Sequence, residues 1–284
     1  MPTSPADTAT TSSRSLTQSS KKFTRDTAGS QSLERGLQLL RVFRAGVAVL
    51  TNSELALRTG LPRPTVSRLT RSLVDAGFLN YDLPRRAYRL SSICLSLSDA
   101  YARANPELGI AEPLMKQVAD REKVNIGMAI SDQSGMIYLL AFRESADAVS
   151  KTRRLVPGSH VPMEMTAIGR AYLTGLESAE RDERMKKFSS KAGRKWPALR
   201  AELSRCSDEI ERLGYCTAEW EPGGLFGIAT RLWAPDGTLY AINLSFQSVD
   251  ADSSTLIARL APILLQLVAD IDRAWKQGVE FFPE

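Results

Sequence analysis

The chain has 284 residues, of which 43% are apolar and 24% are charged. These are values of a globular protein, and they argue against a wholly disordered, fibrous or disulfide-stapled chain. The formal net charge is only +5, but residues 31–90 carry +6, residues 1–30 carry +2 and the remainder carries −3. The excess in 31–90 comes from ten arginines and no lysine, which indicates a small phosphate-facing module joined to a larger acidic one.

The cysteine and histidine content limits the chemistry that the chain can perform. Cys94, Cys206 and Cys216 form no CxxC motif, and His160 is the only histidine. We therefore expect no metal site, no cofactor and no catalytic site, in a reducing compartment. The one enzymatic alternative is a small-molecule hydrolase in which His160 activates a serine such as Ser159.

Residues 1–30 are rich in Ser and Thr and have no apolar segment, so they predict a disordered tail and not a secretion signal. No window approaches 18 uninterrupted apolar residues, from which we expect no membrane-spanning helix and a cytoplasmic protein.

Residues 32–43 (SLERGLQLLRVF) predict a short core helix with Leu33, Leu37 and Leu40 on one face and Gly36, Leu39 and Phe43 beside it. The next helix starts at TNSE, where Thr51 and Glu54 have the spacing of a capping box, and it stops at Gly60.

A longer helix follows in LPRPTVSRLTRSLVDAGF, because Val66, Leu69 and Leu73 share one face and would point inward. The strand pattern of residues 78–90 then predicts a hairpin with a basic turn. A short capped helix, a tight turn, a longer helix with outward Arg, Ser and Thr, and a hairpin are typical of a winged helix-turn-helix that reads DNA. The candidate DNA-binding residues are Thr51, Arg63, Thr65, Ser67, Arg68, Arg71, Arg85 and Arg86.

These stretches, with TGLPRPTVSRL as the most specific, resemble the N-terminal domain of the IclR family of bacterial transcriptional regulators. Later stretches, VPMEMTAIGRAYL, EPGGLFGIA and AINLSF, resemble the effector-binding domain of the same family. The resemblance implies a winged helix-turn-helix over residues 31–91, a linker helix over 92–105 that helps to form dimers, and a GAF-like domain over 106–284. Cys94 in the linker is expected to be buried.

The pattern after residue 106 agrees with this layout. Strands recur in pairs at 124–132 with 136–142 and at 225–233 with 238–246, while helices are predicted near 107–123, 166–174, 178–188, 197–213 and 253–275. Paired strands with helices at the ends favour an α+β fold with an antiparallel sheet over a doubly wound one.

The helix that starts near Thr166 offers free backbone amides and a favourable dipole, which suit a carboxylate. By resemblance, the effector-binding residues are Val161, Met163, Thr166, Ala167, Ile168, Leu225, Gly227, Asn243 and Ser245. Gly227 is expected to leave room for an aromatic ring, and Arg143, Arg153 and Arg154 are candidates for balancing the charge of an acid.

The sequence thus predicts a regulator whose operator binding or activation is controlled by a small organic acid, aromatic or short aliphatic, in a catabolic operon. Its expected partners are double-stranded operator DNA, the acid effector and further copies of itself, as a dimer or a dimer of dimers. RNA polymerase would join them if the protein activates transcription, and no membrane is expected. The hydrolase and a regulator with a vestigial, unresponsive pocket remain as alternatives.

Overall fold

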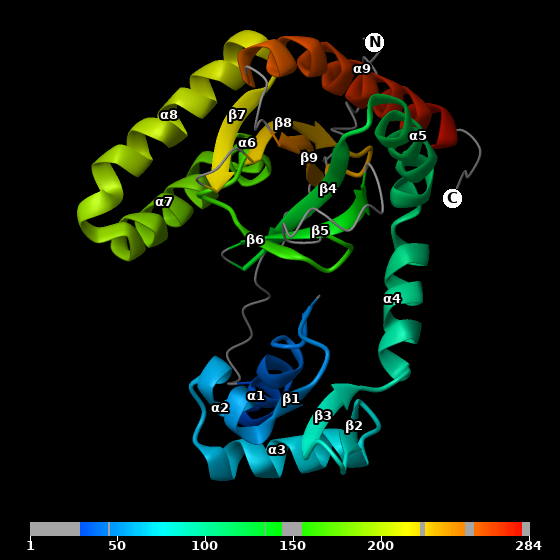
Figure 1. Ribbon diagram of the computed structural model, residues 1–284, viewed down its shortest axis with the longest axis vertical. Coiled ribbons are helices and arrows are strands. Elements are labelled where there is room, and N and C mark those ends of the chain that lie inside the picture. The colour runs from blue at the N-terminus through cyan, green and yellow to red at the C-terminus, as the bar shows by residue number, and fades with distance from the viewer. Residues whose placement is uncertain are drawn as a thin grey trace, which may run out of the picture.

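The computed structural model describes residues 29–44, 46–133, 135–143, 155–221, 225–247 and 253–279. Apart from its last two residues, the predicted tail lies outside these ranges, as do Arg153 and Arg154. The described chain forms a small N-terminal module and a larger domain, which are connected by a single helix along one side of the molecule (Figure 1).

The small module contains three helices and a three-stranded antiparallel sheet of order β1-β3-β2. Its elements are α1 (Gln31–Leu40), β1 (Leu50–Thr51), α2 (Asn52–Thr59), α3 (Arg63–Asp75), β2 (Leu79–Asp82) and β3 (Ala87–Leu90). The hairpin β2–β3 is the predicted wing, and β1 adds a strand to it that the sequence pattern did not indicate.

Local chemistry explains where these helices begin and end. The Thr51 side chain and the Glu54 carboxylate form the predicted capping box of α2, and Gly60 ends α2 in the left-handed conformation at φ 71°. Pro62 and Pro64 stand at the start of α3, where a missing amide costs little. Val66 and Leu69 of α3 are buried in the core of the module, as predicted.

The predicted leucine face of α1 is not the face that this helix buries. Leu33 and Leu37 are 62% and 50% exposed, whereas Gly36, Leu39 and Phe43 are buried. The leucine spacing correctly indicated a helix, but α1 packs against α3 through the neighbouring face. An apolar stripe therefore remains on the surface of α1.

The connecting helix α4 (Ile93–Ala104) coincides with the predicted linker but buries none of its residues within the chain. Its exposed apolar side chains are Ile93, Leu95, Leu97 and Tyr101. Cys94 is half-buried and not buried as expected, because α4 packs on little except the next helix.

The larger domain is built on a six-stranded antiparallel sheet of order β6-β5-β4-β9-β8-β7, as the α+β prediction requires. Its strands are β4 (Asn125–Asp132), β5 (Gly135–Phe142), β6 (His160–Pro162), β7 (Cys216–Glu221), β8 (Leu225–Trp233) and β9 (Leu239–Gln247). The three-residue strand β6 was not predicted. It pairs with β5 at the edge of the sheet.

Helices cover both faces of this sheet (Figure 1). One core lies under α5 (Pro106–Glu122) and α9 (Ser253–Val279), and a second lies under α6 (Ala167–Thr174) and α8 (Trp196–Leu213), with α7 (Ser178–Ala192) packed beside α8 and contributing Phe188 to the second core. The second core carries the candidate effector site, because β7, β8 and β9 meet the start of α6 there.

The last helix, α9, bears on the prediction that no helix spans a membrane. Among the described helices, residues 253–278 alone are long and apolar enough to cross one, because few charges interrupt them even though no uninterrupted apolar run exists. In the fold, Leu260, Leu264 and Ile271 of this helix are buried against the sheet. These contacts assign α9 to the core.

Candidate DNA-binding surface and effector site

The exposed face of α3 carries the predicted DNA-binding residues. Arg63, Ser67, Arg68 and Arg71 are exposed and Thr65 is half-buried, while the opposite face of the helix closes the core. The helix lies at the end of the molecule that is farthest from the larger domain (Figure 1). A helix of this width with outward guanidinium and hydroxyl groups matches a major groove in size and chemistry.

The wing holds its two predicted arginines differently. In Arg85, the guanidinium lies 2.8 Å from the Asp82 carboxylate and the backbone amide donates to the same carboxylate at 3.0 Å. The amide bond is the larger cause, and together these contacts lower the pKa of Asp82. Arg86 occupies the left-handed conformation at φ 48°, and its side chain is exposed at the tip of the turn. The wing strand also exposes Arg89, which lies opposite Asn80 and was not predicted.

Thr51 has a structural task of its own. Its hydroxyl donates to the Glu54 carboxylate at 2.7 Å and accepts from the Glu54 amide at 3.3 Å. The Thr51 amide also donates to that carboxylate, and this bond is the main cause that lowers the pKa of Glu54. Thr51 is therefore committed to the cap of α2 before any contact with DNA.

The candidate effector site begins at the first turn of α6. Thr166 caps the helix by accepting from the Gly169 amide at 3.3 Å, and its hydroxyl donates to the Pro162 carbonyl at 2.8 Å. The amides of Ala167 and Ile168 in the same turn have no acceptor within the helix. A Cβ at Gly169 would stand 2.2 Å from the Met163 carbonyl oxygen, so this glycine lets the helix start lie directly on the preceding segment.

Polar side chains from the sheet face this helix start. Asn243 and Ser245 alternate along β9, and both are buried. The Tyr138 hydroxyl of β5 donates to the Asn243 side-chain oxygen at 3.3 Å. Burial raises the pKa of Tyr138, so that its phenol remains a hydrogen-bond donor at neutral pH.

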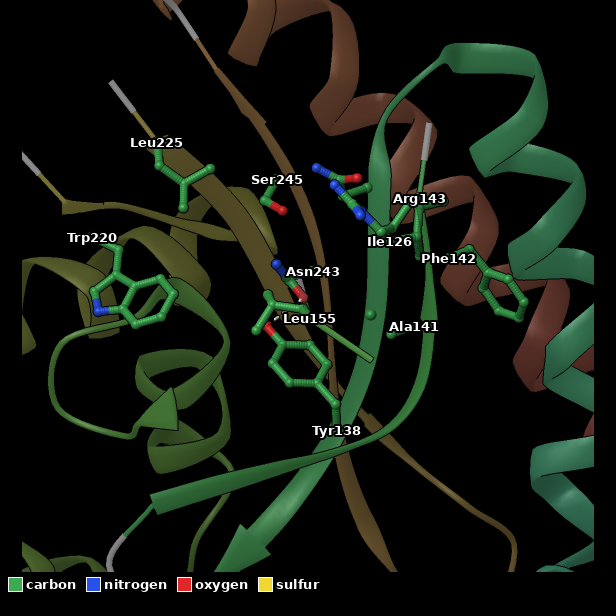
Figure 2. Close-up of a pocket in the computed structure, with 12 residues that line it drawn as sticks. Ile126, Tyr138, Ala141, Phe142, Arg143, Leu155, Trp220, Leu225, Asn243 and Ser245 are labelled. Atoms are coloured by element: carbon green, nitrogen blue, oxygen red, sulfur yellow. Dashed lines mark hydrogen bonds between the residues drawn. The ribbon is translucent and has the colours of Figure 1, made fainter. Parts of the chain in front are cut away.

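These groups enclose a narrow space that is partly filled by aromatic rings. Figure 2 shows the Tyr138 and Trp220 rings across this space from each other, with Leu155 beside the Tyr138 ring and Asn243 and Ser245 above it in the view. The half of the space between β4, β5 and β9 measures about 40 Å³, and the half against α6 measures about 30 Å³. This is room for water molecules and not for an aromatic acid.

Seven of the nine predicted effector-binding residues line the half against α6. They are Thr166, Ala167, Ile168, Leu225, Gly227, Asn243 and Ser245. Val161 and Met163 lie instead in the neighbouring core, where both are buried. The prediction missed Tyr138, Leu155, Trp220 and Phe226, which supply most of the apolar wall. Arg143, named from sequence only as a possible counter-charge, lines the other half.

Gly227 does not create the room that was expected of it. A Cβ at this position would stand 3.1 Å from the Ala167 Cβ, so α6 already occupies the space that a side chain at position 227 would take. Gly227 lets α6 approach β8 closely. Any space for a ring must come from movement of the side chains around it, such as Trp220 and Leu155.

The arrangement around His160 does not resemble a hydrolytic site. Its Nε2 lies 2.8 Å from the Asp132 carboxylate and its Nδ1 lies 3.1 Å from the Gly158 carbonyl. The Ser159 hydroxyl accepts from the Val156 amide at 2.9 Å. Both ring nitrogens are therefore engaged with groups other than Ser159.

Comparisons with known proteins agree with this architecture. Residues 32–83 match the IclR helix-turn-helix domain, and residues 105–273 match the bacterial transcriptional regulator IclR C-terminal domain. The chain is 30% identical over 243 residues to the HTH-type transcriptional regulator TsaQ1/TsaQ2 of Comamonas testosteroni, which covers 84% of this chain and 86% of that protein.

Solved structures share the fold. An IclR family transcriptional regulator from Brucella abortus superposes with a TM-score of 0.73 at 31% identity, over 88% of this chain and 94% of that one. An IclR homologue from Microbacterium hydrocarbonoxydans in complex with 4-hydroxybenzoate gives a TM-score of 0.66 at 20% identity, over 87% and 99%. These matches are to DNA-binding regulators and not to hydrolases. The chain belongs to the IclR family of bacterial transcriptional regulators.

Proposed function

We propose that this regulator binds its operator through α3 and the wing, and that a small organic acid at the start of α6 controls that binding. The acid is an aromatic or short aliphatic carboxylate, and the regulated genes form a catabolic operon. The observation that carries the proposal is the buried polar group formed by Asn243, Ser245 and the Tyr138 hydroxyl opposite the first-turn amides of α6.

Hydrogen-bond chemistry favours a carboxylate among small ligands. The α6 amides and the Tyr138 hydroxyl are donors, the Asn243 amide and the Ser245 hydroxyl supply more, and the dipole of α6 favours negative charge at its start. Arg143 stands at the other end of the space, where it would balance the charge. An acceptor-rich anion therefore satisfies this site better than a neutral ligand.

The apolar wall favours an aromatic skeleton for that acid. Trp220, Phe226, Leu155 and Leu225 line the space around the polar group, and aromatic side chains bind a ring by stacking or edge contacts. A protein of the same fold has been solved in complex with 4-hydroxybenzoate, and this likeness supports the choice of an aromatic acid. Because the space is small, binding must displace side chains, and this movement would link occupancy to the rest of the protein.

Self-association is part of the proposal. The exposed apolar side chains Leu33 and Leu37 of α1 and Leu95 and Leu97 of α4 lie on the part of the chain that carries the DNA-binding module. A second copy that covers them would present two recognition helices to a palindromic operator. The same dimer would let the acid control DNA affinity. For this control, the acid must favour one arrangement of the two DNA-binding modules over another.

The test is a calorimetric titration of the full chain with benzoate and 4-hydroxybenzoate, with benzamide as the neutral control. We expect the acids to bind and benzamide not to bind. In Asn243→Asp the added carboxylate faces the acid, so binding should weaken at least about tenfold, a cost of about 1.4 kcal/mol. Gln117→Glu makes the same change in charge on the exposed face of α5 and should bind like the wild type.

A second readout connects the site to DNA. An operator is first selected from random DNA with the wild-type protein, and its affinity is measured with and without the acid. The acid should change operator affinity in the wild type and in Gln117→Glu but not in Asn243→Asp. Equal binding of benzamide and benzoate, or an unchanged response in Asn243→Asp, would refute the carboxylate site. Failure of every acid to bind would favour a vestigial pocket.

A further inference from the structure

Two buried cysteines meet behind the candidate effector site. Cys206 of α8 and Cys216 of β7 are both fully buried. The Cys206 thiol lies 3.4 Å from the Thr217 carbonyl oxygen, and the Cys216 thiol lies 3.6 Å from the Ala167 carbonyl oxygen in the first turn of α6. The side chains of Cys206 and Cys216 are also close enough to influence each other's pKa. Both thiols thus lie where α8, the edge strand β7 and the start of α6 meet.

Two arginines distinguish Cys206 from an ordinary core thiol. Arg170 Nη1 lies 3.7 Å from the Cys206 sulfur, and Arg205 Nη2 lies 3.8 Å from it. Glu202 pairs with both guanidinium groups, and Glu209 pairs with Arg205. The Glu202 and Glu209 carboxylates offset part of the positive charge of the two arginines. Their oxygens lie against the guanidinium groups, and the guanidinium groups lie against the Cys206 sulfur.

The protonation states of the two thiols separate as a result. The interaction with Cys216, followed by the charge of Arg170 and Arg205, outweighs burial and lowers the pKa of Cys206 below its usual value. The interaction with Cys206 and burial raise the pKa of Cys216 well above its usual value. The pair therefore combines a more acidic thiol, Cys206, with a less acidic one, Cys216, which is the arrangement of a reactive and a resolving cysteine.

We propose that Cys206 and Cys216 form a redox-active dithiol that hydrogen peroxide oxidises to a disulfide. The Cys206 thiolate attacks one oxygen of the peroxide, the O–O bond breaks, and the released hydroxide takes up a proton to become water. The Cys216 sulfur then attacks the sulfenic sulfur of Cys206, the S–O bond breaks, and the Cys216 proton leaves with the hydroxyl as a second water. Two thiols and one peroxide thus give one disulfide and two waters.

Peroxide has a short route to the sulfur. The Arg205 side chain is 40% exposed and its Nη2 lies 3.8 Å from the Cys206 sulfur, so this guanidinium connects the surface to the buried thiol. Peroxide is small and uncharged, which lets it pass such a side chain during ordinary fluctuations. Cys94, which is half-buried in α4, provides an internal reference.

Oxidation would change the wall of the effector site. The disulfide ties α8 to β7 and removes the thiol proton that Cys216 offers to the Ala167 carbonyl. Ala167 stands at the start of α6 and packs on Gly227, so its position fixes the amides that would receive the acid. This consequence rests on the proposed function, whereas the dithiol chemistry does not.

The experiment uses the reduced full chain, freed of reductant and treated with hydrogen peroxide at pH 7. Trypsin separates the two cysteines into residues 206–212 and 213–231, so a disulfide appears as a linked pair of these peptides. We expect this pair in the wild type and in Cys94→Ser. In Cys216→Ser we expect a sulfenic acid at Cys206 that dimedone traps, and in Cys206→Ser we expect no reaction faster than that of Cys94.

A second measurement tests the role of Arg205 as a positioning residue. The rate at which iodoacetamide alkylates Cys206 is followed against pH in the wild type, Arg205→Gln and Arg205→Lys. Arg205→Gln should move the midpoint to higher pH and slow the reaction at pH 7 severalfold, and Arg205→Lys should restore most of the rate. Circular dichroism establishes that each variant is folded.

Absence of the 206–212 to 213–231 link in the folded wild type would overturn the proposal, as would reaction of Cys206 no faster than Cys94. An unshifted midpoint in Arg205→Gln would remove Arg205 from it. Because no acid is present in these measurements, failure of the proposed effector leaves their outcome unchanged. Calorimetry of the reduced and the oxidised protein with 4-hydroxybenzoate then tests whether the dithiol influences the effector site. Equal affinities of the two forms for the acid would restrict the dithiol to a role outside the effector response.

Discussion

The two folded parts of the chain use arginine in opposite ways. In the described part of the small module, ion pairs are made only by Arg41 and Arg85. The exposed arginines of α3, and Arg86 and Arg89 of the wing, form no ion pair in this described part. In the larger domain, arginines on several helices and strands pair with carboxylates, namely Arg170, Arg184, Arg205, Arg231 and Arg259. An unpaired guanidinium remains available to DNA, whereas a paired one joins elements of the fold.

We expect the largest loss of operator affinity when unpaired arginines are removed from α3. Arg63→Ala with Arg68→Ala should weaken binding to a selected operator by about 2–6 kcal/mol, thirtyfold or more, because each good base contact contributes about 1–3 kcal/mol. A gel-shift titration measures the change. Arg194→Ala with Arg200→Ala removes the same charge from exposed positions of the larger domain and should leave affinity nearly unchanged. Equal losses in the two double variants would mean that only total charge matters.

The next effect concerns the small core of the module. Leu55 of α2 is fully buried, and Leu55→Ala should cost about 2–5 kcal/mol, a large share of the stability of so small a domain. DNA binding at 37 °C should be lost. Leu57→Ala, on the same helix, removes a side chain that is 85% exposed and should have little effect.

Fluorescence separates the two parts in this experiment. All four tryptophans lie after residue 190, so the tryptophan signal reports the larger domain alone. Its urea midpoint should be the same in Leu55→Ala and in the wild type. A midpoint that falls together with the far-ultraviolet signal of the helices would show that the module and the larger domain unfold as one unit.

The helices of the fold could be predicted from sequence wherever an apolar repeat and a helix-capping motif occurred together. The capping box at Thr51 and the αL glycine at Gly60 set the helix boundaries by local chemistry alone. Periodicity also placed Val66 correctly in the core. It failed for Leu33 because a leucine stripe indicates a helix without saying which neighbour will cover it, and the three-residue strand β6 is too short to carry a period.

The site was harder to predict than the fold. The resemblance indicated the helix start and the polar pair on β9, but Tyr138 and Trp220 lie on other strands, where alternation defines two faces without saying which one the site uses. Gly227 illustrates the opposite error, because sequence shows a missing side chain and not the Ala167 methyl group that fills its place. A glycine in a strand therefore does not by itself predict a cavity.

A smaller effect tests whether Thr51 belongs to the DNA surface or to the fold. Thr51→Ala removes the cap of α2 and should lower the stability of the module by about 1 kcal/mol, while Thr51→Ser keeps the hydroxyl and should restore it. Urea unfolding followed by circular dichroism measures both. Operator affinity is then corrected for the folded fraction. A loss that persists after the correction would place Thr51 in contact with DNA, and its absence would assign Thr51 to the cap alone.

The smallest effect concerns the ion pair that joins the two parts. Arg41, at the end of α1, lies 2.5 and 2.6 Å from the two oxygens of Asp132 at the end of β4, and His160 lies 2.8 Å from the same carboxylate. Burial raises the pKa of Asp132, but the hydrogen bonds from Arg41 and His160 outweigh burial, so the pKa lies below the ordinary value of 3.8. The carboxylate is therefore ionised at neutral pH.

The sign of the pH effect follows from this lowered pKa. The ion pair stabilises the contact between the module and the larger domain above about pH 4, and the stabilisation is lost as the pH falls through the lowered pKa. Because Arg41 is partly exposed, the contribution should be about 1 kcal/mol or less. Asp132→Asn should thus speed amide hydrogen exchange at the end of α1 by up to about fivefold at pH 7. Asp120→Asn, which breaks an exposed pair within α5, should leave exchange at that site unchanged.

Hydrogen exchange measured at acidic pH completes the test of this contact. After correction for the intrinsic rate, wild-type exchange at the end of α1 should rise toward that of Asp132→Asn as the pH falls below 4, while the variant stays level. Identical wild-type and variant rates at pH 7 would mean that the pair does not hold the two parts together. In that case α4 would be the whole of their connection, and any signal from the effector site to α3 would have to travel through that helix or through a second copy of the chain.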